Sequence, residues 1–269
     1  MYYSKIPTDD GQFLIVNGLN QVIQTHRATP FRPLSWQTAD LLCHDLNEIH
    51  EKNVVKEQNT KKDAAEVYNA ESWSHELAES FGYCLLSTMI ENVVHNHFSK
   101  PELDLNHDIQ WDMLYRITPQ PPGFQDQHAL VSSLKPLLSS DWADLSMNWS
   151  SSLQEMEEDE VDFVSENIIL ELQSITDAFT WTECSITKLL LNFTEGFSIT
   201  AVVFWVSNKI DSAIFNDLFR VFYGEEALDS DTKQSKFRSS FFIARLEYLR
   251  KINASIAIHD KSFIDRLEG

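Results

Sequence analysis

The stretch QFLIVNGLNQVIQT, from Gln12 to Thr25, predicts a β-hairpin near the start of the chain. β-favouring residues stand on both sides of Asn17-Gly18, and this dipeptide tolerates the positive φ angles that a tight hairpin turn requires. Pro30 and Pro33 then close an extended segment.

A helix is predicted directly after these prolines. Ser35 is suited to be its N-cap, because a serine side chain can accept a hydrogen bond from the first turn. Four apolar residues follow at helical spacing, Ala39, Leu42, Leu46 and Ile49. Hairpin and helix together predict an N-terminal α+β unit.

A second run with β-strand alternation, Trp111 to Tyr115, ends at a group of prolines, Pro119, Pro121 and Pro122. An unpaired strand would leave backbone groups unsatisfied, so we expect this strand, near residues 110–117, to pair with the N-terminal hairpin. The prolines would then mark a domain junction.

Helical periodicity dominates the rest of the chain, as in Thr176–Leu191, Phe197–Asn208, Ser212–Tyr223 and Lys233–Ile258. The predicted fold class is therefore α+β. We expect a small N-terminal α+β domain, residues 1–122, with an antiparallel hairpin-based sheet, followed by a larger all-α domain, residues 123–269.

Composition narrows the classes of partner. Hydrophobic residues make up 43% of the chain and aromatic residues 12%, which predicts a packed core. The net charge of -20 disfavours nucleic acids and anionic lipid surfaces as partners. The longest apolar run, Phe197 to Val206, is about half a membrane span. Together with an N-terminus that has no export signal, this predicts a soluble protein without membrane partners.

Catalytic motifs are not evident. Seven glycines provide no Gly-rich phosphate loop, and the three cysteines lack metal-ligand spacing, so they are expected to be core thiols of a reducing compartment. We therefore expect no cofactor and no enzyme activity. An alternative is a metal-dependent hydrolase built on the cluster His95, His97, Asp104, His107 and Asp108.

Four segments, in this order, resemble one family, the assembly chaperones (complex assembly factor two) that act on the alpha subunit of the ATP synthase catalytic sector. The hairpin and first helix match at Gly18, Thr25, Pro33, Ser35, Ala39 and Asp45. CLLSTMIEN, Cys84 to Asn92, is similar to the family's R-L-A-N-T-A-I-D: Leu85, Thr88 and Ile90 match, and Glu91 stands for the acid. Cys84 and Ser87 replace the family's arginine and asparagine. The third segment matches at Asp112, Tyr115, Arg116, Gln127, Pro136 and Leu137, and the fourth is Phe197 to Phe219.

The resemblance implies a non-enzymatic chaperone that holds a free alpha subunit, in the bacterial cytoplasm or, in a eukaryote, in the mitochondrial matrix. The family's acidic segment between its last helices corresponds to YGEEALDSD, so the implied contact residues are Glu225, Glu226, Asp229 and Asp231, with Arg116 and Glu91 as secondary candidates. An acidic adaptor with another client is the remaining alternative.

Overall fold

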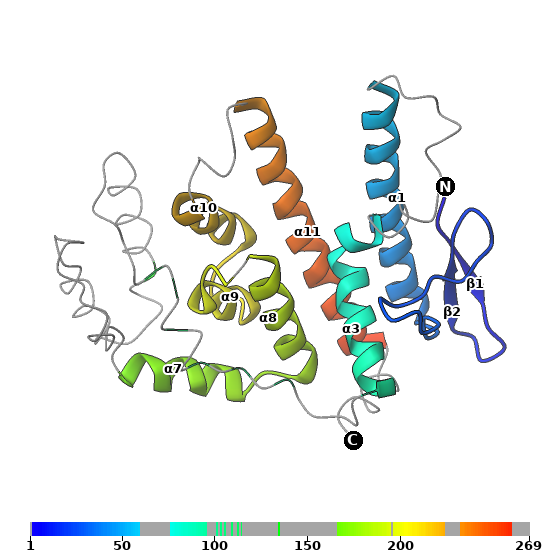
Figure 1. The fold of residues 1–269 in the computed structure, drawn as a ribbon. Helices are drawn as coiled ribbons and strands as arrows, with labels where there is room; N and C mark the ends of the chain where they lie inside the picture. Colours follow the sequence, from blue (N-terminus) through cyan, green and yellow to red (C-terminus); the bar gives the residue numbers. More distant parts are fainter. Residues whose placement is uncertain are drawn as a thin grey trace. The chain divides into compact units, whose positions relative to one another are not determined.

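Two compact units make up the chain: residues 1–100 with residues 244–269, and residues 101–243. A computed structural model describes residues 2–59, 76–95, 166–194, 196–223 and 232–259, together with positions 101, 103, 105, 109, 112, 114 and 134 (Figure 1). This division differs from the predicted boundary after residue 122, because the end of the chain returns to the N-terminal unit.

The first unit begins with the predicted antiparallel sheet. Strand β1, Ser4–Pro7, pairs with β2, Phe13–Val16, in a register that places Ile6 opposite Leu14. Single bridges extend this pair into a meander, joining Val16 to Val22, Gln24 to Pro30 and Phe13 to Leu34. The predicted hairpin is confirmed, and β1 adds a strand that sequence reasoning missed.

Three turns of one design connect the meander, at residues 8–12, 17–21 and 25–29. In each, the first amide donates to the fifth carbonyl (2.8, 3.0 and 2.8 Å), and the fourth amide donates to the first carbonyl (3.0, 2.9 and 3.0 Å). The fourth residue is left-handed in every case, with φ of 77° at Gly11, 59° at Asn20 and 58° at Ala28. These are three-residue hairpin loops ending in a left-handed residue.

Gly18 therefore does not supply the positive φ that the Asn17-Gly18 dipeptide suggested. A Cβ atom at Gly18 would lie 2.7 Å from the ring of Tyr2, so glycine is needed there for close packing. Asn20 takes the left-handed position, which asparagine tolerates better than most residues.

Two helices of the first unit pack near the meander, α1 (Trp36–Asn59) and α3 (Phe81–His95). The amide of Thr38 donates to Oγ of Ser35 at 3.3 Å, which confirms the predicted N-cap. The last helix, α11 (Thr232–His259), completes the unit with its C-terminal part, where Ser255 hydrogen-bonds Thr38 at 2.8 Å.

The second unit surrounds a short buried helix, α9 (Ile199–Val206), all eight residues of which are buried. It contacts α7 (Glu166–Asp177), α8 (Trp181–Phe193) and α10 (Ser212–Tyr223). The small N-terminal α+β unit followed by helices confirms the predicted fold class. Among the described helices, none has both the length and the apolar character needed to cross a bilayer.

The strand predicted from Trp111 to Tyr115 is wrong at both of its described positions. Asp112 is in no regular element and Leu114 lies in a 3-10 turn, while the described sheet contains only β1 and β2. Asp112 is fully buried. Its carboxylate accepts the amides of Leu114 and Thr200, both at 2.9 Å, and so caps the first turn of α9.

Candidate functional site

An open cavity of about 760 Å³ lies in the first unit, between the meander and the region where α3 begins. Ten residues of the described part line it: Leu14, Gln21, Val22, Gln24, Thr25, His26, Pro30, Phe31, Leu77 and Tyr83. They include no carboxylate and no lysine or arginine. The described lining thus carries no acidic or strongly basic side chain and is partly apolar, in a chain whose net charge is -20.

One side of the cavity is fixed by a row of polar side chains on α3. Tyr83, Ser87 and Glu91 are spaced four residues apart, so they lie on one face of the helix. Tyr83 Oη donates to the carbonyl of Gln24 (2.5 Å), Ser87 Oγ accepts the amide of His26 (3.0 Å), and Glu91 Oε1 accepts the amide of Arg27 (2.6 Å). The row therefore holds two backbone amides of the turn at residues 25–29 and the carbonyl group directly before it.

Glu91 is the predicted contact residue whose side chain the structure describes. Its carboxylate faces the turn, because Oε1 accepts the Arg27 amide and Oε2 lies 3.8 Å from Arg27 Nε. The Glu91 side chain is 13% exposed, whereas that of Arg27 is 62% exposed. The exposed charge at this place is consequently the arginine.

Tyr83 joins this row to the apolar part of the cavity. Its ring stacks on Phe31 with centroids 5.7 Å apart and meets the edge of His26 at 5.2 Å. Burial raises the pKa of Tyr83 to about 12, so the phenol stays protonated at neutral pH and keeps donating to Gln24.

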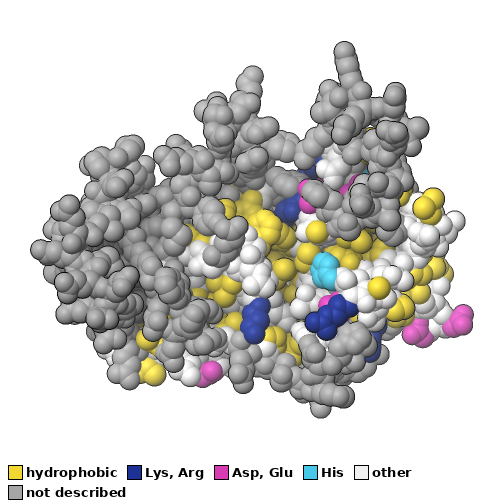
Figure 2. Space-filling model, viewed as in Figure 1, with side chains coloured by type: hydrophobic (Ala, Val, Ile, Leu, Met, Phe, Trp, Pro, Cys, Tyr) yellow, Lys and Arg dark blue, Asp and Glu magenta, His cyan; other side chains and the backbone are white. Residues whose placement is uncertain are grey.

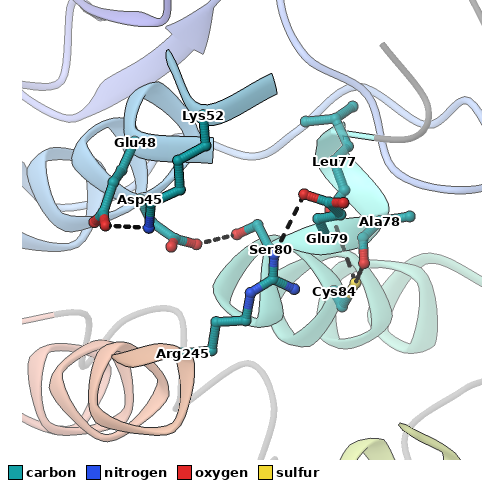
Figure 3. Close-up of polar contacts among 9 residues, drawn as sticks. All are labelled: Asp45, Glu48, Lys52, Leu77, Ala78, Glu79, Ser80, Cys84 and Arg245. Carbon is teal, nitrogen blue, oxygen red and sulfur yellow. Dashed lines mark hydrogen bonds and ion pairs between the residues drawn. The ribbon is translucent and has the colours of Figure 1, made fainter. Parts of the chain in front are cut away.

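A buried polar cluster anchors the start of α3 (Figure 3). The Ser80 hydroxyl donates to the Asp45 carboxylate of α1, and Ser80 Oγ accepts the amide of Tyr83 at 3.1 Å, so Ser80 also caps α3. Arg245 of α11 pairs with Glu79 at 3.4 Å. The cluster fixes the helix that carries the polar row.

The buried carboxyl and the thiol of this cluster are both shifted toward their neutral forms. Burial raises the pKa of Asp45, against the hydrogen bond from Ser80. Burial also raises the pKa of Cys84 to about 11, and its Sγ contacts the carbonyl of Ala78 at 3.5 Å. A thiol with this pKa is a weak nucleophile at neutral pH, so the cluster is suited to structural support.

Apolar side chains also reach the surface of the described part, as Figure 2 shows for one face, where charged side chains are scattered among them. The large exposed ones are Ile6, Leu19, Trp36, Leu170 and Phe193. Ile6 is the cross-strand neighbour of Leu14, so it extends the apolar lining of the cavity onto the sheet surface.

Most of the other predicted site residues lie outside the described residues. This holds for Glu225, Glu226, Asp229, Asp231 and Arg116, and for His97, Asp104, His107 and Asp108 of the metal hypothesis; of His95 only the backbone is described. Within the described part, no group of three or more His, Cys, Asp or Glu residues is arranged to hold a metal ion. All three cysteines are free.

Sequence reasoning missed His26 and Arg27, which lie in a turn and match no motif. A signal was nevertheless present, since Ser87 and Glu91 interrupt an apolar helix at four-residue spacing. The structure places Glu91, from one segment of the family resemblance, against the turn that begins at Thr25, from another segment. No family model, curated protein or solved structure matches this chain.

Proposed function

We propose that the chain is an assembly chaperone that binds the free alpha subunit of the F-type ATP synthase catalytic sector and prevents its aggregation before ring assembly. One observation carries the proposal: two resembling segments, the hairpin ending at Thr25 and the helix with Ser87 and Glu91, meet through direct hydrogen bonds from the turn. If the two segments resembled the family only by chance, the resemblance would not predict that they contact each other.

A holding chaperone needs a surface that binds the client, and binding alone stabilises the client by mass action without nucleotide hydrolysis. The open cavity and the exposed Ile6 beside it offer an apolar, concave surface on a strongly acidic protein. An interface of ordinary size, roughly 1,600 Å² in total, would extend well beyond this cavity. The proposed place of action is that of the alpha subunit, the bacterial cytoplasm or the mitochondrial matrix.

Purified alpha subunit tests the proposal. We expect an equimolar amount of the chain to suppress light scattering by warmed alpha subunit and to co-elute with it in size-exclusion chromatography. An unrelated protein of similar size and net charge is the control, because acidity alone raises solubility. Equal scattering and no co-elution would contradict the proposal and favour the adaptor with another client.

A further inference from the structure

We propose that the cavity of the first unit, with the His26-Arg27 turn beside it, binds an extended segment of a partner protein in which apolar residues stand next to a carboxylate. The identity of the partner rests on the proposed function. The contact surface and the chemistry that it selects do not.

The apolar half of the recognition comes from the meander. Leu14 and Val22 are half-buried on the cavity wall, and Leu77 and Phe31 lie deeper. Ile6 is 40% exposed and pairs across the strands with Leu14. Covering this surface with an apolar side chain removes apolar area from water on both partners.

The turn beside the cavity is held in an unfavourable conformation. Ala28 has φ of 58°, a left-handed conformation that is unfavourable for a residue with a Cβ atom. The other two turns of the meander have a left-handed residue at the same position, and at this turn Ser87 and Glu91 also bind the two amides that precede Ala28. Strained backbone over-determined by its surroundings is concentrated at functional sites, where it presents side chains in a fixed geometry.

The side chains presented by this turn are basic. His26 and Arg27 are both exposed, and the cavity-lining residues that the structure describes include no carboxylate. The ion pair of the Arg27 guanidinium with Glu91, 3.8 Å long, exceeds hydrogen-bonding distance. A guanidinium matches a carboxylate with two parallel hydrogen bonds, so the turn fits an acidic residue of the partner.

The net charge of the chain alone predicts a preference for basic segments, so binding of an acidic segment would distinguish this site from a general charge effect. A charge of -20 repels acidic peptides in general, but at physiological salt this field decays over about 8 Å. Selection of an acidic segment would therefore come from groups at the site itself.

Two short fluorescein-labelled peptides test the inference with the full chain. One repeats Leu-Asp-Ser-Ser, and its match repeats Leu-Lys-Ser-Ser. In anisotropy titrations at physiological salt, we expect the aspartate peptide to bind about tenfold more tightly than the lysine peptide, the size of one charge-assisted contact. Equal binding, tighter binding of the lysine peptide, or no binding of either would overturn the proposal.

Variants locate the binding. Arg27→Gln should weaken binding of the aspartate peptide about tenfold, whereas Lys188→Gln, which removes one positive charge from an exposed position of α8, should leave it unchanged. Gln24→Glu adds a negative charge in the cavity wall and should weaken binding similarly. Gln37→Glu makes the same change at an exposed position of α1 and is its control. Gln24→Glu and its control Gln37→Glu leave Arg27 in place, so they still test the site if Arg27→Gln disturbs the turn. Equal affinity of all four variants would refute the assigned site.

The two proposals fail separately. If the alpha subunit co-elutes with the wild-type chain and equally with Arg27→Gln and Gln24→Glu, the chaperone function stands and the contact surface is wrong. If the aspartate peptide binds as expected but the alpha subunit does not, the surface stands and the partner is another protein.

Discussion

Asp45 and Ser80 form a buried hydrogen bond although they lie 35 positions apart in the sequence. Ser80 donates to the carboxylate and at the same time accepts the Tyr83 amide in the first turn of α3. One hydroxyl therefore satisfies a buried acid of α1 and an unpaired amide of α3, and it fixes the helix whose far end holds the His26-Arg27 turn.

Removing this hydroxyl should destabilise the protein. Ser80→Ala loses an N-cap and leaves the Asp45 carboxylate without its donor, so we expect the free energy of unfolding to fall by about 2 kcal/mol. Urea unfolding followed by circular dichroism measures the change. Thr88→Ala, at an exposed position of the same helix, is the control and should change it by less than about 0.5 kcal/mol. Equal effects of the two variants would mean that the buried contact contributes little.

The Asp45 carboxyl also predicts a dependence of stability on pH. Burial raises its pKa above the ordinary 3.8, so the unfolded chain ionises this group at lower pH than the folded chain. Its contribution to stability is complete below pH 3.8 and is lost as the pH rises through the raised folded value. Asp45→Asn accepts the Ser80 hydrogen bond but never ionises, so its stability should gain on that of the wild type as pH rises from about 4 to about 7.

Urea unfolding at a series of pH values measures the difference between the two proteins. Asp40→Asn, which alters an exposed carboxylate on the same helix, controls for the change in net charge. A difference for Asp45→Asn that stays constant across the series, or that follows the Asp40→Asn series, would show that Asp45 ionises alike in both states.

How far the sequence predicted this fold depends on whether the signal was local. Helix α10 begins and ends where the apolar stripe of Ser212–Tyr223 predicted, and α1 begins after the expected Ser35, because periodicity and caps are local properties. Asp112 misled because one of the two amides that its carboxylate accepts, that of Thr200, lies 88 positions away: the alternation around Asp112 resembles a strand, yet the carboxylate is buried against α9.

The candidate site was predictable only in part, for the same reason. Glu91 could be singled out because it stands for the acid of one segment of the family resemblance. Arg27 could not, because its exposure follows from a turn geometry set by Ser87 and Glu91, more than sixty residues away in sequence. The turn dipeptide Asn17-Gly18 gave the right hairpin but the wrong left-handed residue, since the Tyr2 ring determines the need for glycine.

Strain at Ala28 predicts a stabilising substitution. Ala28→Gly relieves the left-handed conformation of an exposed residue, so the free energy of unfolding should rise by about 1 kcal/mol. Ala213→Gly is the matched change at an exposed position inside α10, where glycine should lower stability by about 1 kcal/mol. Thermal unfolding distinguishes the opposite signs. A loss of stability in both variants would argue against a strained turn.

Close packing of α11 in the first unit makes a prediction about a pair of residues. A Cβ atom at buried Gly82 of α3 would lie 2.1 Å from Cδ1 of Ile252, so Gly82→Ala should lower the free energy of unfolding by about 1 to 3 kcal/mol. Ile252→Val removes that Cδ1 atom and alone should cost about 1 kcal/mol. The double variant should be more stable than Gly82→Ala, because the valine leaves room for the new methyl group. A double-mutant cycle in urea measures the coupling, and additive losses would show that α3 and the C-terminal part of α11 do not pack at this point.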